Sequence, residues 1–249
     1  MRIALVFPGQ GSQTVGMVQA LRDGADHGVF RSADEALGEP LSELVATGPA
    51  EELDRTENSQ PAILAASVAI HRVWAARAAA AGLPAPMFFA GHSMGQYSAM
   101  VAAGVLGLED AIRLVRERGR LMQASPAGSM AAIIGLDDAQ LPELEAIGSA
   151  AGVFTIANRN SPGQVVVSGE VAAVQAASDA AKGLGAKRAI VLPISIAAHS
   201  PLMAEAADGM RTAIAGVDFR DPTAPLLANA DARLLTTAED CRAELIDYI

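Results

Sequence analysis

The residues best suited to chemistry lie between an apolar run and an alanine-rich helical pattern. The run Met87–Ala90 leads into Gly91-His92-Ser93-Met94-Gly95, which has the spacing G-x-S-x-G. A sharp strand-to-helix turn of this kind exposes a serine hydroxyl above the carboxyl end of a sheet, and its glycines let the backbone pass without Cβ clashes. Ser93 is therefore predicted to be a nucleophile, although a turn that merely favours Gly and Ser would carry the same residues.

A serine hydroxyl needs a base within hydrogen-bond reach, and the chain has four histidines. His92 adjoins the serine and is expected to point away from it, His71 falls within the alanine-rich helix, and His27 lies in an apparent surface loop. His199 remains, because it follows an apolar run and precedes a helix start with a proline, at the edge of an α/β sheet where ligands bind. No acid between Ser93 and His199 stands out as the third member of a triad.

One arginine lies among the apolar residues of its helix. In the helix predicted from about Glu109 to Met122, Arg118 falls within the apolar stripe, whereas Arg113, Arg116 and Arg120 do not. A buried guanidinium must meet a carboxylate, and its planar fork suits bidentate binding. The pattern leaves open whether that carboxylate belongs to the protein or to a ligand.

The segment Phe7-Pro8-Gly9-Gln10-Gly11-Ser12-Gln13 directly follows the first apolar run. It differs from a dinucleotide fingerprint, because Thr14 stands where the third glycine belongs and no acid is marked at the end of a second strand. NAD binding is therefore not expected. Such a backbone at the carboxyl end of a strand could instead direct an N–H at an oxyanion, together with the N–H of Met94.

Strands and helices alternate along the chain, which indicates an α/β fold. Ile3–Phe7 and Met87–Ala90 are continuous apolar runs, as buried parallel strands should be. From 129 to 193 the order is strand, helix, strand, strand, helix, strand, as in a ferredoxin-like unit. We therefore predict an α/β-hydrolase-like core with a parallel sheet, residues 1–128 and 194–249, and an inserted ferredoxin-like α+β subdomain, residues 129–193.

Composition argues against several classes of protein. With 28 acidic and 18 basic residues the net charge is −10, and no Lys/Arg block occurs, so no nucleic-acid partner is expected. The single cysteine, Cys241, can form no intrachain disulfide or Cys/His metal cluster, which favours the cytoplasm and no metal site. The uncharged stretch 78–108 is interrupted by Gly, Pro and polar residues, so we expect helix, strand, turn and helix rather than a membrane span.

Further motifs extend the pattern along nearly the whole chain. Besides the loop after the first strand and the serine motif, they are Asn58-Ser59-Gln60-Pro61-Ala62, Arg118-Gly119-Arg120-Leu121-Met122-Gln123, the stretch from Asn158 to Gly169, and Ala198-His199-Ser200. Together they resemble the malonyl-CoA:acyl carrier protein transacylases. Acyltransferase domains of polyketide and animal-type fatty acid synthases carry similar motifs, so the resemblance points to the family rather than to fatty acid or polyketide biosynthesis.

The resemblance implies a ping-pong reaction that moves a malonyl group from coenzyme A to the phosphopantetheine thiol of acyl carrier protein. By this resemblance Ser93 forms the acyl ester, and His199 acts as base and then as acid. Backbone N–H groups matching Gln10 and Met94 hold the oxyanion in such enzymes, and the arginine matching Arg118 binds the malonyl carboxylate. Malonyl-CoA is then a substrate, and no permanently bound cofactor is implied.

The same resemblance extends to less central positions. The family orients its histidine with a main-chain carbonyl, here that of Asn229, and its glutamine matching Gln60 lies near the site without a chemical step. Gln96 stands where many relatives have Glu, and it is not expected to be catalytic. Met94 is consistent with malonyl-type members. Relatives continue past a helix like 239–249, so the C-terminal end is expected to be shortened.

Two other functions fit part of this pattern. A serine carboxylesterase or thioesterase would share the serine and histidine, but it needs water in the site and no cation for the acyl tail, so Arg118 favours transfer. An inactive carrier-protein-binding module is the second alternative. Because carrier proteins of the family are acidic, as this chain is, docking would need a local basic patch, which we expect from Arg113, Arg116 and Arg120.

Overall fold

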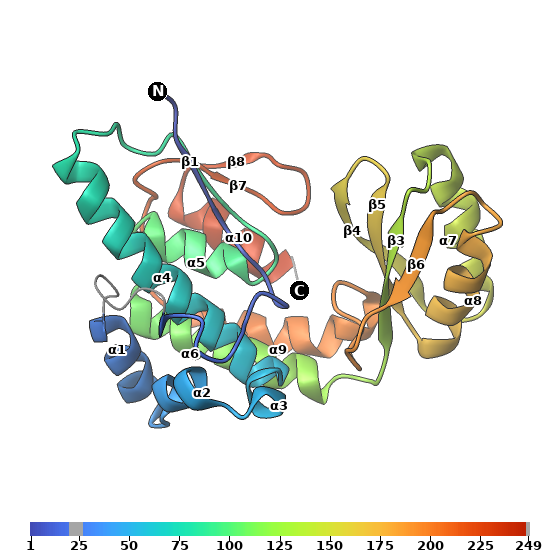
Figure 1. The fold of residues 1–249 in the computed structure, drawn as a ribbon, viewed down its shortest axis with the longest axis horizontal. Coiled ribbons are helices and arrows are strands. Elements are labelled where there is room, and N and C mark those ends of the chain that lie inside the picture. The colour runs from blue at the N-terminus through green and yellow to red at the C-terminus, as the bar shows by residue number, and fades with distance from the viewer. Residues whose placement is uncertain (20–26, 248–249) are drawn as a thin grey trace. The chain divides into compact units, whose positions relative to one another are not determined.

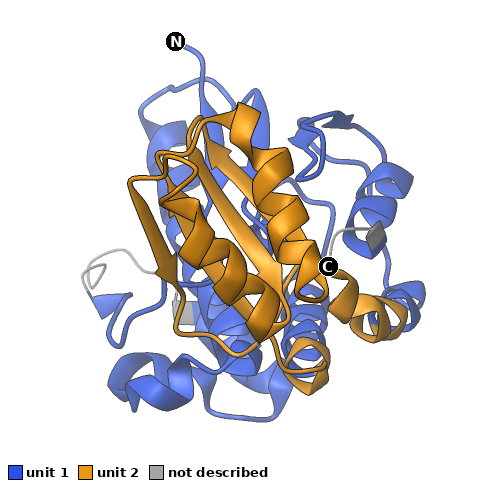
Figure 2. Cartoon of the chain, turned by 90° about the vertical axis from the view of Figure 1, so that its right-hand side faces the viewer, with its two compact units in different colours: residues 1–120, 210–248 blue, residues 121–209, 249 orange. Residues whose placement is uncertain are grey.

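The computed structural model describes residues 1–19 and 27–247 (Figure 1). It divides into two compact units, residues 1–120 with 210–248, and residues 121–209 (Figure 2). The chain changes unit inside helices α6 (Leu108–Ala124) and α9 (Ala204–Ala215). The sequence placed these changes at 128/129 and 193/194, where the strand pattern alters, because periodicity does not show that a helix continues from one unit into the next.

The sheet of unit 1 has the strand order β1-β2-β7-β8. Its strands are β1 (Ala4–Phe7), β2 (Phe88–Gly91), β7 (Leu226–Leu227) and β8 (Leu234–Leu235). The first three run parallel, and β8 returns antiparallel to β7 as a hairpin. Phe7 pairs with Gly91, so the loop after β1 and the serine turn after β2 leave the sheet at the same edge.

Unit 1 also contains helices. Besides part of α6 and α9, they are α1 (His27–Leu37), α2 (Leu41–Thr47), α3 (Ala50–Leu53), α4 (Thr56–Ala80), α5 (Gly95–Ala102) and α10 (Ala238–Asp247). Of these, α5 packs against β1 and β2. His27, expected in a loop, begins α1, and residues 23–26 of that expected loop lie outside the described residues. The stretch 78–108 forms the end of α4, then β2, the serine turn and α5, as predicted.

Helix α4 is long and apolar enough, by length and composition, to be a candidate membrane span. Half of its most apolar 18-residue stretch is buried inside the structure, and the helix packs against α1 and α5. Helix α4 also has buried polar residues near its start, including Asn58 and Gln60. These features are typical of a core helix.

Unit 2 contains a four-stranded antiparallel sheet of order β4-β5-β3-β6. Its elements are β3 (Ser129–Ile134), a 3-10 turn (Asp138–Gln140), α7 (Leu141–Ala150), β4 (Phe154–Ser161), β5 (Gln164–Gly169), α8 (Val171–Ala181), β6 (Arg188–Val191) and a second 3-10 turn (Pro201–Met203). Apolar residues of the sheet, α7 and α8 share one core. The β-α-β-β-α-β order and the parallel sheet of unit 1 confirm the predicted fold class.

The half-buried imidazole of His71 provides a test of the α4 packing. Its ring contacts the rings of Phe7, Trp74 and Phe89. Burial, and then the charge of Arg72, lower the pKa of His71 below its usual 6.5. Between the lowered pKa of the folded protein and the usual value of 6.5, His71 is therefore protonated more fully in the unfolded chain than in the folded one. The contribution of neutral His71 to stability is fully present above about pH 6.5 and is lost as the pH falls through the lower folded pKa.

We expect the His71→Phe variant to lose less stability than the wild type between about pH 7.5 and pH 5.5, because phenylalanine keeps the ring contacts but takes up no proton. Urea unfolding across this range measures the slope. Equal slopes for the two proteins would remove His71 as a source of the pH dependence.

Candidate active site

The strand, turn and helix predicted around Ser93 are present. Ser93 has a φ of 52°, a left-handed value that is uncommon for a residue with a Cβ and that occurs in strained functional turns. A Cβ at Gly91 would overlap the backbone of Gly95, and one at Gly95 would lie 2.5 Å from the carbonyl oxygen of Phe7. The turn therefore depends on glycine at both positions, because β1, β2 and α5 approach one another there.

The backbone N–H groups of this turn are almost all engaged. Five of the six N–H groups from Gly91 to Gln96 donate to acceptors within unit 1. The exception is the N–H of Met94, which has no acceptor among the residues that the structure describes. Met94 follows the serine and caps the N-terminus of α5, where the helix dipole favours negative charge. A fixed donor of this kind suits an oxyanion.

The loop after β1 contacts the serine turn. A Cβ at Gly9 would lie 2.7 Å from the carbonyl oxygen of His92, so the two backbones approach closely. The next residue, Gln10, donates from its side-chain Nε2 to Thr56 Oγ1 at 3.2 Å. Its backbone N–H finds no acceptor within the described part of the chain. The loop thus brings a second available N–H donor near the serine turn.

Arg118 is buried, as its place in the apolar stripe predicts, with 2% of its surface exposed. Its Nη1 donates to Gln60 Oε1 at 3.0 Å, and its Nη2 donates to Ser93 Oγ at 3.2 Å. Helix α6 can approach α4 closely because Gly119 has no side chain. A Cβ at this position would lie only 2.5 Å from the Cα of Glu57. The packing of the two helices therefore places a guanidinium against the serine hydroxyl.

Tyr97 adds a neutral hydroxyl to this buried region. Its side chain is 2% exposed, and its hydroxyl has no hydrogen-bond partner among the described residues. Burial raises the pKa of Tyr97 to about 12, against the opposing effect of the positive charge of Arg118. Tyr97 therefore remains protonated throughout the physiological range.

His199 belongs to unit 2, whereas Ser93 belongs to unit 1, so their pairing stays a prediction. His199 has a φ of 59° and directly precedes the turn Pro201–Met203. Ser200 caps that turn by accepting from Leu202 N, and its hydroxyl donates to Ala197 O at 2.7 Å. The predicted helix start with a proline is present, but β6 ends at Val191, earlier than the strand expected before His199.

Two of the other histidines can be compared with the expectations drawn from the sequence. His71 lies within α4 among aromatic rings, and the side chain of His92 is exposed. Only His199 therefore combines a loop position with partial burial among the three histidines whose side chains the structure describes.

Comparison with known proteins identifies the family. Residues 4–244 match the family described as acyl transferase domain. The chain belongs to this family.

Named relatives agree with this assignment. The malonyl CoA-acyl carrier protein transacylase of Escherichia coli strain K12 is 46% identical over 252 residues, covering 98% of this chain and 80% of the relative. The protein of the same name from Bacillus subtilis is 41% identical over 254 residues, covering 100% of this chain and 78% of the relative. The chain thus spans about four fifths of the length of these relatives.

Solved structures show the same similarity. An acyl carrier protein S-malonyltransferase from Vibrio cholerae has a TM-score of 0.90 and 44% identity, covering 99% of this chain and 81% of that one. A malonyl-transacylase solved in complex with its type II PKS acyl-carrier protein has a TM-score of 0.91 and 43% identity, with 99% and 80% covered.

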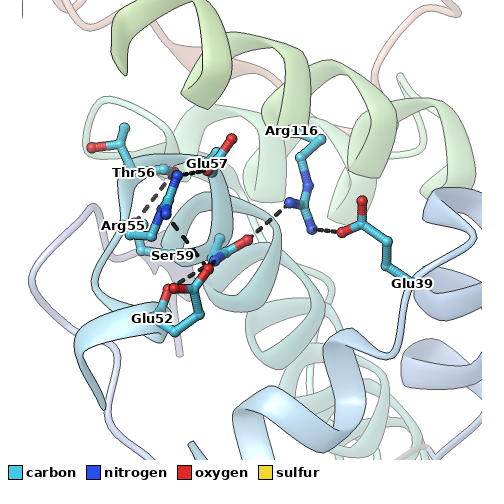
Figure 3. A network of polar contacts seen from close by, with 8 residues as sticks. Glu39, Glu52, Arg55, Thr56, Glu57, Ser59 and Arg116 are labelled. Atoms are coloured by element: carbon cyan, nitrogen blue, oxygen red, sulfur yellow. Dashed lines mark hydrogen bonds and ion pairs between the residues drawn. The ribbon is translucent and has the colours of Figure 1, made fainter. Parts of the chain in front are cut away.

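One expectation about the surface of this acyl transferase domain is wrong. Arg116, expected in an exposed basic patch, has only 15% of its side chain exposed and pairs with Glu39 at 2.9 Å (Figure 3). Its Nη1 also donates to Asn58 Oδ1 at 2.8 Å. Helical periodicity placed Arg116 outside the apolar stripe of α6, but the ends of α1 and α4 lie against that side.

The two remaining arginines of the expected patch are exposed, yet each faces an acid one helical turn away. Arg113 pairs with Asp110 at 3.2 Å, and Arg120 pairs with Glu117 at 3.0 Å. Such exposed pairs contribute little stability, but they cancel the positive charge locally. The structure therefore gives no support to a basic docking patch made from Arg113, Arg116 and Arg120.

Sequence reasoning missed how the serine turn is held from outside. The role expected for the main-chain carbonyl of Asn229 stays a prediction, and its side-chain Oδ1 makes a further contact by accepting from Ser93 N at 2.9 Å. Gln96 is 1% exposed, accepts from Gly91 N and donates to Leu227 O, so its amide links β2 to β7. Glu244 of α10 accepts from Asn229 N at 2.6 Å. Only Gln96 could have been noticed in the sequence, as a polar residue in an apolar helix. The contacts of Asn229 and Glu244 join segments that are distant in sequence.

Metal-binding residues do not cluster in the described part of this domain. Across residues 1–19 and 27–247 no group of three or more His, Cys, Asp or Glu side chains is placed to hold a metal ion. Cys241 is buried, and burial first, followed by nearby acids, raises the pKa of its thiol to about 12. This thiol stays protonated and is a poor nucleophile.

The Gly91→Ala variant tests the steric requirement of the serine turn. Because the added Cβ would overlap the backbone of Gly95, we expect a loss of at least about 3 kcal/mol in the free energy of unfolding. Gly216→Ala is the matched control, since a Cβ there meets nothing within 4 Å, and it should change stability by less than ~0.5 kcal/mol. Urea unfolding of both variants gives the comparison, and equal midpoints would contradict the steric argument.

Proposed function

We propose that this acyl transferase domain moves a malonyl group from coenzyme A to the phosphopantetheine thiol of acyl carrier protein, through an ester on Ser93. The observation that carries the proposal is the hydrogen bond from Arg118 Nη2 to Ser93 Oγ at 3.2 Å. A buried guanidinium beside the nucleophile suits an acyl group that ends in a carboxylate. The relatives named as malonyl transacylases support the same substrate.

The first half-reaction forms the ester. Ser93 Oγ attacks the thioester carbon of malonyl-CoA while His199 takes its proton. The carbonyl oxygen becomes an oxyanion, which accepts from the backbone N–H groups of Gln10 and Met94. When the C–S bond breaks, His199 returns the proton to the sulfur, so coenzyme A leaves as the thiol and the malonyl group stays on Ser93.

The second half-reaction repeats these steps in reverse order. The phosphopantetheine thiol gives its proton to His199 and attacks the ester carbon through sulfur. The same two N–H groups hold the second oxyanion. The C–O bond then breaks, and Ser93 Oγ regains the proton from His199. In this scheme the main-chain carbonyl of Asn229 orients the imidazole, as in the family.

Arg118 keeps the malonyl group in place between the two half-reactions. Gln60 accepts from Nη1 and thereby fixes the plane of the guanidinium, whose Nη2 faces the serine. A carboxylate bound there orients the thioester carbon for attack, which lowers the entropic part of the barrier. Gln60 is thus a positioning residue and takes no chemical step.

The proposal includes the setting of the reaction. Malonyl-CoA is a substrate rather than a resident cofactor, acyl carrier protein is the partner, and the cytoplasm is the location. Either fatty acid or polyketide biosynthesis could use the malonyl carrier protein formed.

Intact-mass spectrometry tests the ester. Mixing the domain with malonyl-CoA should add one malonyl group to the wild type and none to Ser93→Ala, and carrier protein should then remove it from the wild type. A carboxylesterase or thioesterase would release free malonate without carrier protein. No mass increase in the wild type would favour an inactive carrier-binding module.

The Arg118→Ala variant tests recognition of the carboxylate. We expect malonyl transfer to fall about 100-fold, which corresponds to the ~3 kcal/mol lost with a buried charge pair, and acetyl transfer to change far less. Single-turnover rates with malonyl-CoA and acetyl-CoA give the ratio. Equal losses for both acyl groups would remove Arg118 from this role.

A further inference from the structure

Three elements that are distant in sequence form a continuous chain of contacts to the nucleophile. Glu244 in α10 accepts from the backbone N–H of Asn229 at 2.6 Å. Asn229 lies in the turn between β7 and β8, and its side-chain Oδ1 accepts from the backbone N–H of Ser93 at 2.9 Å. Neither the ester chemistry nor the binding of malonate uses Glu244.

The contact on Ser93 N fixes the conformation of the nucleophile. Ser93 holds a φ of 52°, which costs free energy and persists only where surrounding contacts enforce it. The hydrogen bond to Asn229 sets the plane of the peptide that enters Ser93. The position of Oγ relative to the N–H of Met94 follows from that plane, so a shift of Asn229 would move the nucleophile away from the oxyanion donors.

The turn that carries Asn229 needs support from outside the sheet. Strands β7 and β8 have only two residues each, and Ala232 in the turn has a φ of 57°. Within the turn, the backbone hydrogen bonds are Ala228 N to Arg233 O and Ala232 N to Ala228 O. Neither of these involves Asn229, whose N–H donates instead to the carboxylate of Glu244.

Glu244 is suited to hold this N–H firmly. It is only 3% exposed, and its second oxygen lies 3.7 Å from Arg233 Nη2 on the same turn. The carboxylate therefore holds the turn at both Asn229 and Arg233, and it does so from the side of α10.

We infer that Glu244 is a positioning residue for Ser93, acting through Asn229. The inference rests on the proposed function, because it assigns Glu244 a share in the rate at which Ser93 is acylated. A role limited to docking α10 on the sheet would lower stability but leave the acylation rate of folded protein unchanged.

Two substitutions of Glu244 distinguish the effect of its side-chain length from the effect of its charge. Glu244→Gln keeps an acceptor at the same reach without the charge, whereas Glu244→Asp keeps the charge but withdraws the acceptor from Asn229 N. We expect Glu244→Asp to slow acylation of Ser93 by malonyl-CoA about 10- to 100-fold, as misplaced catalytic groups do, and Glu244→Gln to stay within about threefold of the wild type. The KM for malonyl-CoA should hardly change, since Arg118 is untouched. Glu239→Ala, an exposed acid on the same helix, is the matched control.

A double-mutant cycle shows whether Glu244 acts through Asn229. Asn229→Ala alone should slow acylation as much as Glu244→Asp does. The double variant should be no more than about twofold slower than Asn229→Ala, because the second change removes a contact that no longer matters. Single-turnover acylation, normalised to the folded fraction from circular dichroism, is the measurement.

Each outcome decides the inference. A wild-type rate for Glu244→Asp, or losses that multiply in the double variant, would overturn it. A slow Glu244→Gln would also overturn it, whatever the rate of Glu244→Asp, since the charge of Glu244 and not only its reach would then matter. If the wild type itself takes up no malonyl group, the proposed function fails, and that result is read before any variant is compared.

Discussion

The burial of one guanidinium constrains much of unit 1. A charge with 2% of its surface exposed must be surrounded by hydrogen-bond partners, because an unpaired ion inside a protein costs several kcal/mol. Arg118 finds Gln60 on α4 and Ser93 at the end of β2, so both helices and the sheet must meet at this point. Gly119 permits the approach of α6 to α4 because it carries no side chain where the helices touch.

Arg116 and Arg118 face α4 together, and their partners Asn58 and Gln60 are also two residues apart. The two contacts fix the register between the helices at two levels. Arg116 is partly exposed to solvent and also pairs with Glu39, whereas Arg118 is buried and also contacts Ser93. The contacts of Arg116 can therefore fix how α6 aligns with α4, while Arg118 stays available to bind the substrate, as the proposed mechanism requires.

The sequence predicted those features that depend on local pattern. The strand, turn and helix around Ser93 follow from an apolar run, two glycines and an alanine-rich stretch, and the burial of Arg118 follows from helical period. Arg116 shows the limit, since period alone cannot tell which neighbouring helix covers a residue. The unit boundaries also differ, because α6 and α9 continue past the point where the strand pattern changes.

Contacts between distant segments were out of reach of such reasoning. Strands β7 and β8 have only two residues each, which is too short to show an alternation of apolar and polar residues. The sequence therefore did not predict the hairpin that carries Asn229. Glu244 looks like any other acid on a helix until the fold places it against the Asn229 N–H. The pairing of Ser93 with His199 and the roles of Gln10 and Met94 remain predictions that rest on the resemblance and on the available N–H donors.

The raised pKa of Tyr97 has a consequence for how this enzyme's kinetics would be interpreted. Arginine keeps its proton at any pH at which proteins are studied, and Tyr97 keeps its own until about pH 12. Neither Arg118, which contacts the nucleophile, nor Tyr97 can therefore contribute an inflection to a titration of the acylation rate over the neutral range. An inflection in such a curve would have to come from a group other than Arg118 and Tyr97.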